Sequence, residues 1–172
     1  MAPSQEKEQP KKVLEDGFVY FLCSLVVFAI DQITKNAVVS MMHLQDSIPV
    51  IPGFFHLTFI MNTGASFGIL QDMPTLFVVV SSLVIVAMCW IVFFWREVGL
   101  GVKCLLGIIS GGALGNLCDR LQFNAVVDFI DFRGVWPYIF NIADMAVVCG
   151  SLALAFAITR DEWKTWFRKP KH

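Results

Sequence analysis

The sequence predicts an all-α membrane protein of four transmembrane helices with a small extracytoplasmic β segment. Hydrophobic residues make up 56% of the 172 residues and the mean hydropathy is +0.67, which is too apolar for a soluble domain. Four apolar stretches, at about 17–40, 74–95, 100–120 and 141–159, are long enough as helices to cross a membrane. We therefore expect residues 1–172 to form a single membrane domain.

The first span follows a charged N-terminal segment and at first sight resembles a signal peptide. However, its apolar run from Gly17 to Ile30 is not followed by a small-residue cleavage site, and a helical pattern continues to about Met42. These features predict an uncleaved signal-anchor helix. Asp31 and Lys35 lie four residues apart in it, which favours an ion pair with Lys35 reaching outwards; direct contact with a ligand is the alternative.

The segment between the first two spans, about residues 48–67, predicts β structure. Phe54 to Met61 is rich in aromatic and β-branched residues, and Asn62-Thr63-Gly64 is typical of a turn. Because the segment is too apolar for a solvated loop, we expect a small sheet at the membrane surface. It serves either as a packing lid over the helices or as a platform for a substrate chain.

In the third span, Gly107, Gly111 and Gly115 recur every four residues, a spacing that lets another helix approach closely. Asn116 and Arg120 are also four apart, so they share a face that points into the bundle or towards the outer interface. Arg120 suits either a structural pair with its neighbour Asp119 or a lipid phosphate.

The basic residues predict the topology. If both termini are cytoplasmic, ten of the thirteen Lys and Arg residues fall on the cytoplasmic side, and residues 36–73 contain none. Positive residues concentrate on the cytoplasmic side of membrane proteins, so we expect both termini there.

Two aspartates lie in apolar surroundings near one membrane face: Asp128, within Val126 to Ile130, and Asp144, within Phe140 to Asp144. A carboxylate at membrane depth is costly and therefore points to function. Asn141 and Asp144 also fit a capping box at the start of the fourth span, with Asp in place of Glu. Capping accounts for Asp144 but leaves Asp128 unexplained; Asp131, nearby, is expected to be solvated.

Two such carboxylates suit peptide hydrolysis by an activated water. One takes a proton from water and the other, protonated, donates to the carbonyl oxygen, so the pair shares a proton. The rivals are a proton-coupled transporter and a structural assembly factor. A transporter favours carboxylates near the midplane and internal repeats, which are not evident here. An assembly factor has no need of the two carboxylates.

The sequence favours neither a metal, a cofactor nor nucleic acid. The five cysteines are scattered without a C-x-x-C pair, and His43 and His56 have no recognisable ligand spacing. The net charge of −1 does not favour nucleic acid. We therefore expect free thiols and activity without metal.

Five blocks of sequence, in order along most of the chain, resemble bacterial lipoprotein signal peptidase, also called signal peptidase II. The blocks are Asp31-Gln32-Ile33-Thr34-Lys35, Asn62-Thr63-Gly64-Ala65-Ser66-Phe67, Gly111 to Arg120, Val126-Val127-Asp128-Phe129, and Phe140-Asn141-Ile142-Ala143-Asp144. Each block alone is weak, but together, at matching membrane depths, they are specific. Met145 and Cys118 are mild departures from the pattern.

The resemblance implies an aspartyl endopeptidase with four membrane helices, a β-cradle and a short periplasmic helix. It implies that Asp128 and Asp144 are catalytic. The residues that it implies bind substrate or support the site are Asp31, Lys35, Asn62, Gly64, Ala65, Gly112, Asn116, Arg120, Asn141 and Ala143.

The implied substrate is a prolipoprotein whose cysteine carries diacylglycerol, cleaved just before that cysteine. The implied location is the bacterial inner membrane, with the active site near the extracytoplasmic face. Membrane lipids are its other expected partners, and we expect a monomer.

Overall fold

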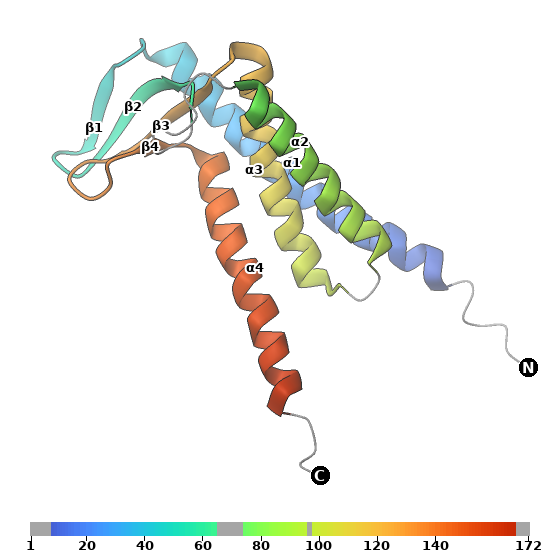
Figure 1. The fold of residues 1–172 in the computed structure, drawn as a ribbon. Coiled ribbons are helices and arrows are strands. Elements are labelled where there is room, and N and C mark those ends of the chain that lie inside the picture. The colour runs from blue at the N-terminus through green and yellow to red at the C-terminus, as the bar shows by residue number, and fades with distance from the viewer. Residues whose placement is uncertain (1–7, 65–73, 96–97, 168–172) are drawn as a thin grey trace, which may run out of the picture.

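The computed structural model describes residues 8–64, 74–95 and 98–167, which form four long helices and one four-stranded sheet (Figure 1). The helices are α1 (Glu8–Met41), α2 (Pro74–Phe94), α3 (Leu100–Phe123) and α4 (Ile142–Phe167). Each contains a stretch long and apolar enough to cross a membrane. The predicted class, four membrane helices with a small sheet, is confirmed.

The sheet is antiparallel, in the order β1-β2-β3-β4. Its strands are β1 (Ser47–Ile51), β2 (Phe55–Asn62), β3 (Val126–Phe132) and β4 (Ile139–Phe140). The predicted outer β segment is present as the hairpin of β1 and β2. The other two strands were not predicted, and β3 is the strand that carries Asp128.

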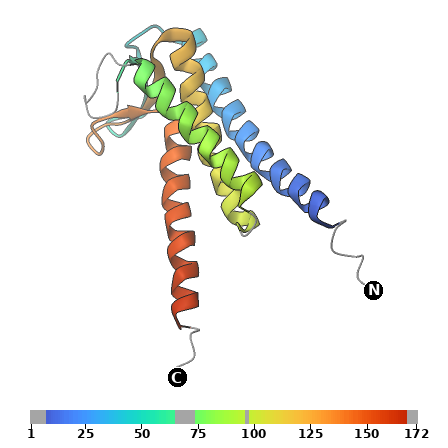
Figure 2. The same ribbon diagram turned by 45° about the vertical axis from the view of Figure 1, so that its right-hand side comes forward.

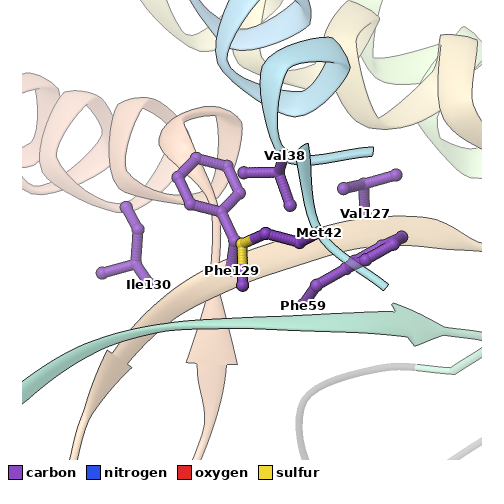
Figure 3. Close-up of a cluster of buried hydrophobic side chains, with 6 residues drawn as sticks. All are labelled: Val38, Met42, Phe59, Val127, Phe129 and Ile130. Carbon is purple, nitrogen blue, oxygen red and sulfur yellow. The ribbon is translucent and has the colours of Figure 1, made fainter. Parts of the chain in front are cut away.

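A compact apolar cluster fastens this sheet to the end of α1 (Figure 3). Val38 and Met42, from the last turns of α1, pack with Phe59 of β2 and with Val127 and Phe129 of β3. All five side chains are buried, so the contact removes apolar area from water and stabilises the sheet on the bundle. Asp128 is thereby held in a strand that cannot shift easily relative to α1.

The glycines of α3 let neighbouring helices approach its backbone, as predicted. A Cβ atom at Gly107 would lie 2.5 Å from the carbonyl oxygen of Tyr20, and one at Gly111 would lie 2.5 Å from that of Ser24. Both carbonyls belong to α1. A Cβ at Gly112 would meet the carbonyl oxygen of Ala143, in α4, at 2.5 Å. α3 is therefore in close backbone contact with both helices.

The sheet lies at one end of the bundle, which we call the sheet end. The N-terminal end of α1 and the C-terminal end of α4 both lie at the opposite end (Figures 1 and 2). The residues described include no short helix separate from the four long ones, and residues 65–73 lie outside the description. The short periplasmic helix stays a prediction.

Candidate active site

Asp128 is buried at the sheet end and accepts a hydrogen bond on each carboxylate oxygen. Asn62 Nδ2 donates to Oδ2 at 2.9 Å, and Asn141 Nδ2 donates to Oδ1 at 2.7 Å. Strand pairing explains the first contact. Asn62 is paired with Val126 across β2 and β3, so its side chain shares a face with Asp128 two residues further along.

Asp144 lies in the first turn of α4, where the predicted capping box is confirmed. The Asp144 N–H donates to Asn141 Oδ1 at 2.8 Å, and the Asn141 N–H donates to Asp144 Oδ2 at 3.3 Å. The second carboxylate oxygen, Oδ1, faces the bundle and accepts a hydrogen bond from Asn116 Nδ2 at 2.7 Å. The aspartate therefore caps its helix and also faces the polar cluster.

Asn141 joins the two aspartates. Its side chain is fully buried, and its oxygen caps α4 while its amide nitrogen faces Asp128 Oδ1. The same nitrogen also lies 3.1 Å from Asn116 Oδ1 and 3.3 Å from the Val127 carbonyl. One residue thus fixes Asp128, Asp144 and Asn116 relative to one another.

The electrostatics of Asp128 suit proton transfer near neutral pH. Burial raises the pKa of Asp128 to about 7, and the nearby Asp144 carboxylate acts in the same direction. Hydrogen bonds from Asn62 and Asn141, and the charge of Lys35, oppose this rise of the pKa. A carboxyl with such a pKa can hold a proton at neutral pH and also release it, as an acid catalyst must.

Next to the aspartate pair, Lys35 lies between the carboxylates of Asp31 and Asp119. Its ammonium is 2.8 Å from Asp31 Oδ2 and 2.9 Å from Asp119 Oδ2, and it donates to Asn116 Oδ1 at 2.9 Å. The predicted Asp31–Lys35 pair is confirmed. The predicted outward reach of Lys35 is wrong: its side chain is 3% exposed, because three acceptors inside the bundle satisfy its three N–H groups.

This charged cluster also holds the backbone segments that carry the aspartates. Asp31 Oδ1 accepts a hydrogen bond from the Ala143 N–H at 2.8 Å, and Asp119 Oδ2 accepts one from the Val127 N–H at 3.0 Å. The first contact fixes the start of α4 and the second fixes the start of β3. Ion pairing with Lys35 and these N–H groups offset the cost of burying the two carboxylates.

Gln32 is part of this cluster and is absent from the predicted site. Its amide nitrogen lies 3.3 Å from Asp31 Oδ2, 3.0 Å from Asp119 Oδ1 and 3.3 Å from the Gly115 carbonyl. An uncharged amide inside an apolar span, directly after an aspartate, was the signal available in the sequence.

Two small residues leave the space that the cluster occupies. Ala143 is fully buried, and Gly112 lies against its carbonyl oxygen. A Cβ at Gly115 would collide with the carboxylate of Asp31. The absence of a side chain at Gly115 therefore makes room for Asp31, in addition to bringing helices together.

Arg120 is not placed in the expected pair with Asp119, and its predicted contact with a lipid phosphate stays a prediction. Its Nη1 donates to the Asn116 carbonyl at 3.2 Å, and its guanidinium lies 4.9 Å from the centre of the Phe77 ring in α2. Asp119 pairs with Lys35 instead, which corrects the expected Asp119–Arg120 pair. Arg120 thus connects α2 to the segment of α3 that carries Asn116.

Of the two remaining predicted residues, Gly64 follows the end of β2. The Gly64 N–H donates to Asn62 Oδ1 at 3.1 Å, so Asn62 is held with its nitrogen towards Asp128. Ala65 lies outside the described residues.

Asp131 was expected to be solvated, and this expectation is wrong. The residue is 9% exposed, and its Oδ2 accepts hydrogen bonds from Thr58 at 2.7 Å and from Arg133 at 3.2 Å. In the sheet it is paired with His56 of β2 and Ile139 of β4. Its partners are separate from those of Asp128 and Asp144, so it does not belong to the pair.

The residues described contain no group of three or more His, Cys, Asp or Glu side chains that could hold a metal ion. Metal independence stays a prediction. The five cysteines are free, as expected, but Cys23 of α1 and Cys104 of α3 bring their sulfur atoms within 3.2 Å of each other.

Comparisons with known proteins show the family and the fold to which the chain is similar. A family model described as signal peptidase (SPase) II matches residues 23–160. A lipoprotein signal peptidase of Pelotomaculum thermopropionicum is 46% identical over 84% of this chain and 94% of its own, and one of Halothermothrix orenii is 41% identical over 83% and 96%. A solved structure of a bacterial membrane enzyme superposes with a TM-score of 0.79 at 32% identity, covering 89% of this chain and 93% of that one.

Proposed function

Since the chain belongs to the signal peptidase II family and is a membrane peptidase that removes signal peptides from prolipoproteins, we propose that Asp128 and Asp144 perform the hydrolysis. The observation that carries this proposal is the shared partner Asn141. It contacts both carboxylates, so the two groups are held as one pair on a fixed frame.

The pair acts on a water molecule placed beside the scissile peptide. The ionised carboxylate takes a proton from the water, whose oxygen attacks the carbonyl carbon. The protonated carboxyl donates its proton to the carbonyl oxygen, which gives a neutral tetrahedral intermediate. Proton transfer to the amide nitrogen then breaks the C–N bond, and the new carboxyl and amino ends separate.

The substrate that we propose is a prolipoprotein carrying a diacylglyceryl cysteine, cut on the N-terminal side of that cysteine. The position of the pair supports this proposal, because it lies at one end of the membrane helices, beside a sheet. An extended peptide can add to a sheet edge. Large apolar side chains are exposed along the helices next to the site, for example Leu76 and Val80 of α2, so acyl chains can remain in lipid.

We further propose that the sheet end faces the outside of the bacterial inner membrane and that both termini are cytoplasmic. This topology follows from the distribution of basic residues in the sequence. A thiol reagent added from outside should then label a cysteine placed at Asp46, directly before β1. It should not label a cysteine placed at Lys169. The reverse pattern would contradict the proposed topology.

We also propose that the protein acts as a monomer with no cofactor, since asparagine side chains and a backbone N–H of the described residues supply hydrogen bonds to both aspartates. Enzyme purified in detergent should be active in the fraction whose mass corresponds to one protein chain. It should also cleave substrate in the presence of a chelator. Loss of cleavage on chelation, restored by zinc, would overturn the aspartyl mechanism.

Cleavage of lipidated and unlipidated prolipoprotein tests the proposal directly. The wild-type protein should cut the lipidated form only. Asp128→Asn and Asp144→Asn should each lower turnover by about a thousandfold or more while the protein stays folded, because the amide can neither take nor donate the required proton.

Asp131→Asn is the matched control, since Asp131 is a third aspartate, on the same strand as Asp128, with separate partners. It should retain most of the turnover and lose some thermal stability. Near-normal turnover in a folded Asp128→Asn or Asp144→Asn variant would show that the chemistry lies elsewhere.

A further inference from the structure

Three asparagines surround the aspartate pair, and each is held with its nitrogen towards a carboxylate. Asn62 and Asn141 donate to Asp128, and Asn116 donates to Asp144. The partner on the oxygen side of each amide is a group that can only donate. These partners are the Gly64 N–H, the Asp144 N–H and the Lys35 ammonium. If any of the three side-chain amides exchanged the positions of its oxygen and nitrogen, its NH₂ group would point at another hydrogen-bond donor, so each orientation is fixed.

Only one of these three partners carries a charge. Lys35 donates to Asn116 Oδ1 at 2.9 Å, and Asn116 Nδ2 donates to Asp144 Oδ1 at 2.7 Å. The hydrogen bonds run from α1 through α3 to α4 in a single direction. An ammonium bound to the amide oxygen polarises the amide, which makes its N–H a stronger donor to the carboxylate.

The two aspartates therefore receive different support. Asp144 accepts from this polarised amide and from the Asn141 backbone N–H at the positive end of α4. Asp128 accepts from two amides whose oxygens accept only from backbone N–H groups. Both environments accommodate a carboxylate, but that of Asp144 favours the ionised form more strongly.

We infer that Lys35 is a positioning residue which, through Asn116, keeps Asp144 ionised as the proton acceptor and leaves the shared proton on Asp128. This inference rests on the proposed function, because it assigns roles within the same pair. It also gives Lys35 a task beyond neutralising the two carboxylates beside it.

The other charged groups around Asp144 do not cancel this effect. They are Asp31 of α1, Asp119 and Arg120 of α3, and Asp128 of β3. Asp31 and Asp119 are each paired with Lys35, and each also accepts a hydrogen bond from a backbone N–H and one from Gln32, so their charges are already compensated. Arg120 attracts the ionised form as well. Asp128 repels a second negative charge, which is the reason for a single shared proton.

The pH profile of cleavage tests the inference. A pair with one acceptor and one donor gives a bell-shaped profile, whose acid side reports protonation of the acceptor. In Lys35→Met the acid side should move to higher pH by about one unit or more, and turnover at pH 6 should fall at least about tenfold. The alkaline side should move much less.

Lys35→Met leaves Asp31 and Asp119 without their cation, so it can fail to fold. The double variant Lys35→Met/Asp31→Asn restores the net charge of the wild-type cluster and still removes the ammonium from Asn116. It should show the same acid-side shift. If it is folded and its acid side matches the wild type, Lys35 does not act on Asp144 and the inference is wrong.

Gln32→Met is the matched control. Gln32 contacts the same two carboxylates as Lys35 but neither Asn116 nor the aspartate pair. It should lower thermal stability and leave the acid side in place. An equal shift in Gln32→Met would mean that any disturbance of the cluster moves the profile, which would overturn a specific role for Lys35.

A double-mutant cycle tests the path through Asn116. Asn116→Ala should shift the acid side in the same direction, and adding Lys35→Met should shift it no further. Additive shifts would overturn the path. Failure of the wild-type protein to cleave lipidated prolipoprotein would instead contradict the proposed function, so the two failures are distinguishable.

Discussion

The row of glycines on α3 serves different purposes in the two halves of the α1–α3 contact. Away from the sheet, Gly107 and Gly111 lie against backbone carbonyls of α1, and Tyr20 donates to Ser110 at 2.8 Å. Towards the sheet, the next glycine of the row, Gly115, lies against the Asp31 carboxylate. The row thus admits backbone in one half and a buried charge in the other.

This difference shows what the sheet end costs and how the cost is offset. The half away from the sheet contains close packing and neutral hydrogen bonds such as that of Tyr20 to Ser110, which is worth about 1 kcal/mol. The sheet half gathers four carboxylates near one ammonium, and three of them, those of Asp31, Asp119 and Asp128, are buried, while Asp144 is partly buried. Backbone N–H groups and asparagine amides supply the remaining hydrogen bonds, so a change there should affect chemistry before it affects packing.

Among changes outside the aspartate pair, Gly115→Ala should produce the largest loss of turnover. Its methyl group would displace Asp31, and the displacement would pass to Lys35 and to the start of α4. We expect turnover to fall by about a hundredfold, the loss that a small misplacement of catalytic groups causes. Gly101→Ala is the control on the same helix, because a Cβ at Gly101 meets no atom within 4 Å. Equal turnover in the two variants would break the comparison between the halves.

Asn62→Ala should produce the next largest effect, through Asp128. The hydrogen bond from Asn62 lowers the pKa of Asp128, so its loss should raise that pKa above about 7. The alkaline side of the pH profile, where Asp128 loses its proton, should then move to higher pH by about one unit. Turnover at pH 7 should fall because Asp128 is less well oriented. If the alkaline side of the profile does not move, it reports the titration of a group other than Asp128.

Asp128→Asn abolishes turnover and should also remove a pH dependence of stability. Because the folded-state pKa of Asp128 is raised, its stabilising influence is present at low pH and is lost as the pH rises through about 7. Asparagine is neutral at every pH, and its Nδ2 faces one of the two amide donors at a cost that does not vary with pH. The melting temperature of the variant relative to the wild type should therefore rise as the pH goes from about 5 to about 8, by roughly 2–4 °C for each kcal/mol. A relative melting temperature that stays constant over this range would contradict the raised pKa.

The smallest effect on activity should come from oxidising Cys23 and Cys104. These thiols lie 3.2 Å apart in the half away from the sheet, where α1 and α3 are already in contact. Copper phenanthroline should join them in a variant that lacks the other three cysteines, and turnover should not change. Peptide mass spectrometry detects the bridge, with Cys104→Ser as control. Lost turnover on bridging would mean that the two halves are mechanically coupled.

The sequence predicted features that depend on local spacing, such as the capping box of Asn141 and Asp144 and the Asp31–Lys35 pair. It failed for β3, because this strand is buried almost throughout and shows no alternation of polar and apolar residues. Its pairing with β2 is also remote along the chain. The buried position of Lys35 depends on Asp119, which comes from another helix and could not be inferred from spacing within the first span.

The double contact of Asn141 has a consequence for the genetics of this protein. Aspartate at 141 would keep the cap on α4 but place a third carboxylate against Asp128. Serine would keep the cap and lose the donor. Only a short amide supplies both an acceptor for the helix and a donor for the pair. We therefore expect that no substitution at position 141 is tolerated, either as a neutral change or as one that gives resistance to a drug that targets the pair. A complementation screen of all substitutions should recover asparagine alone.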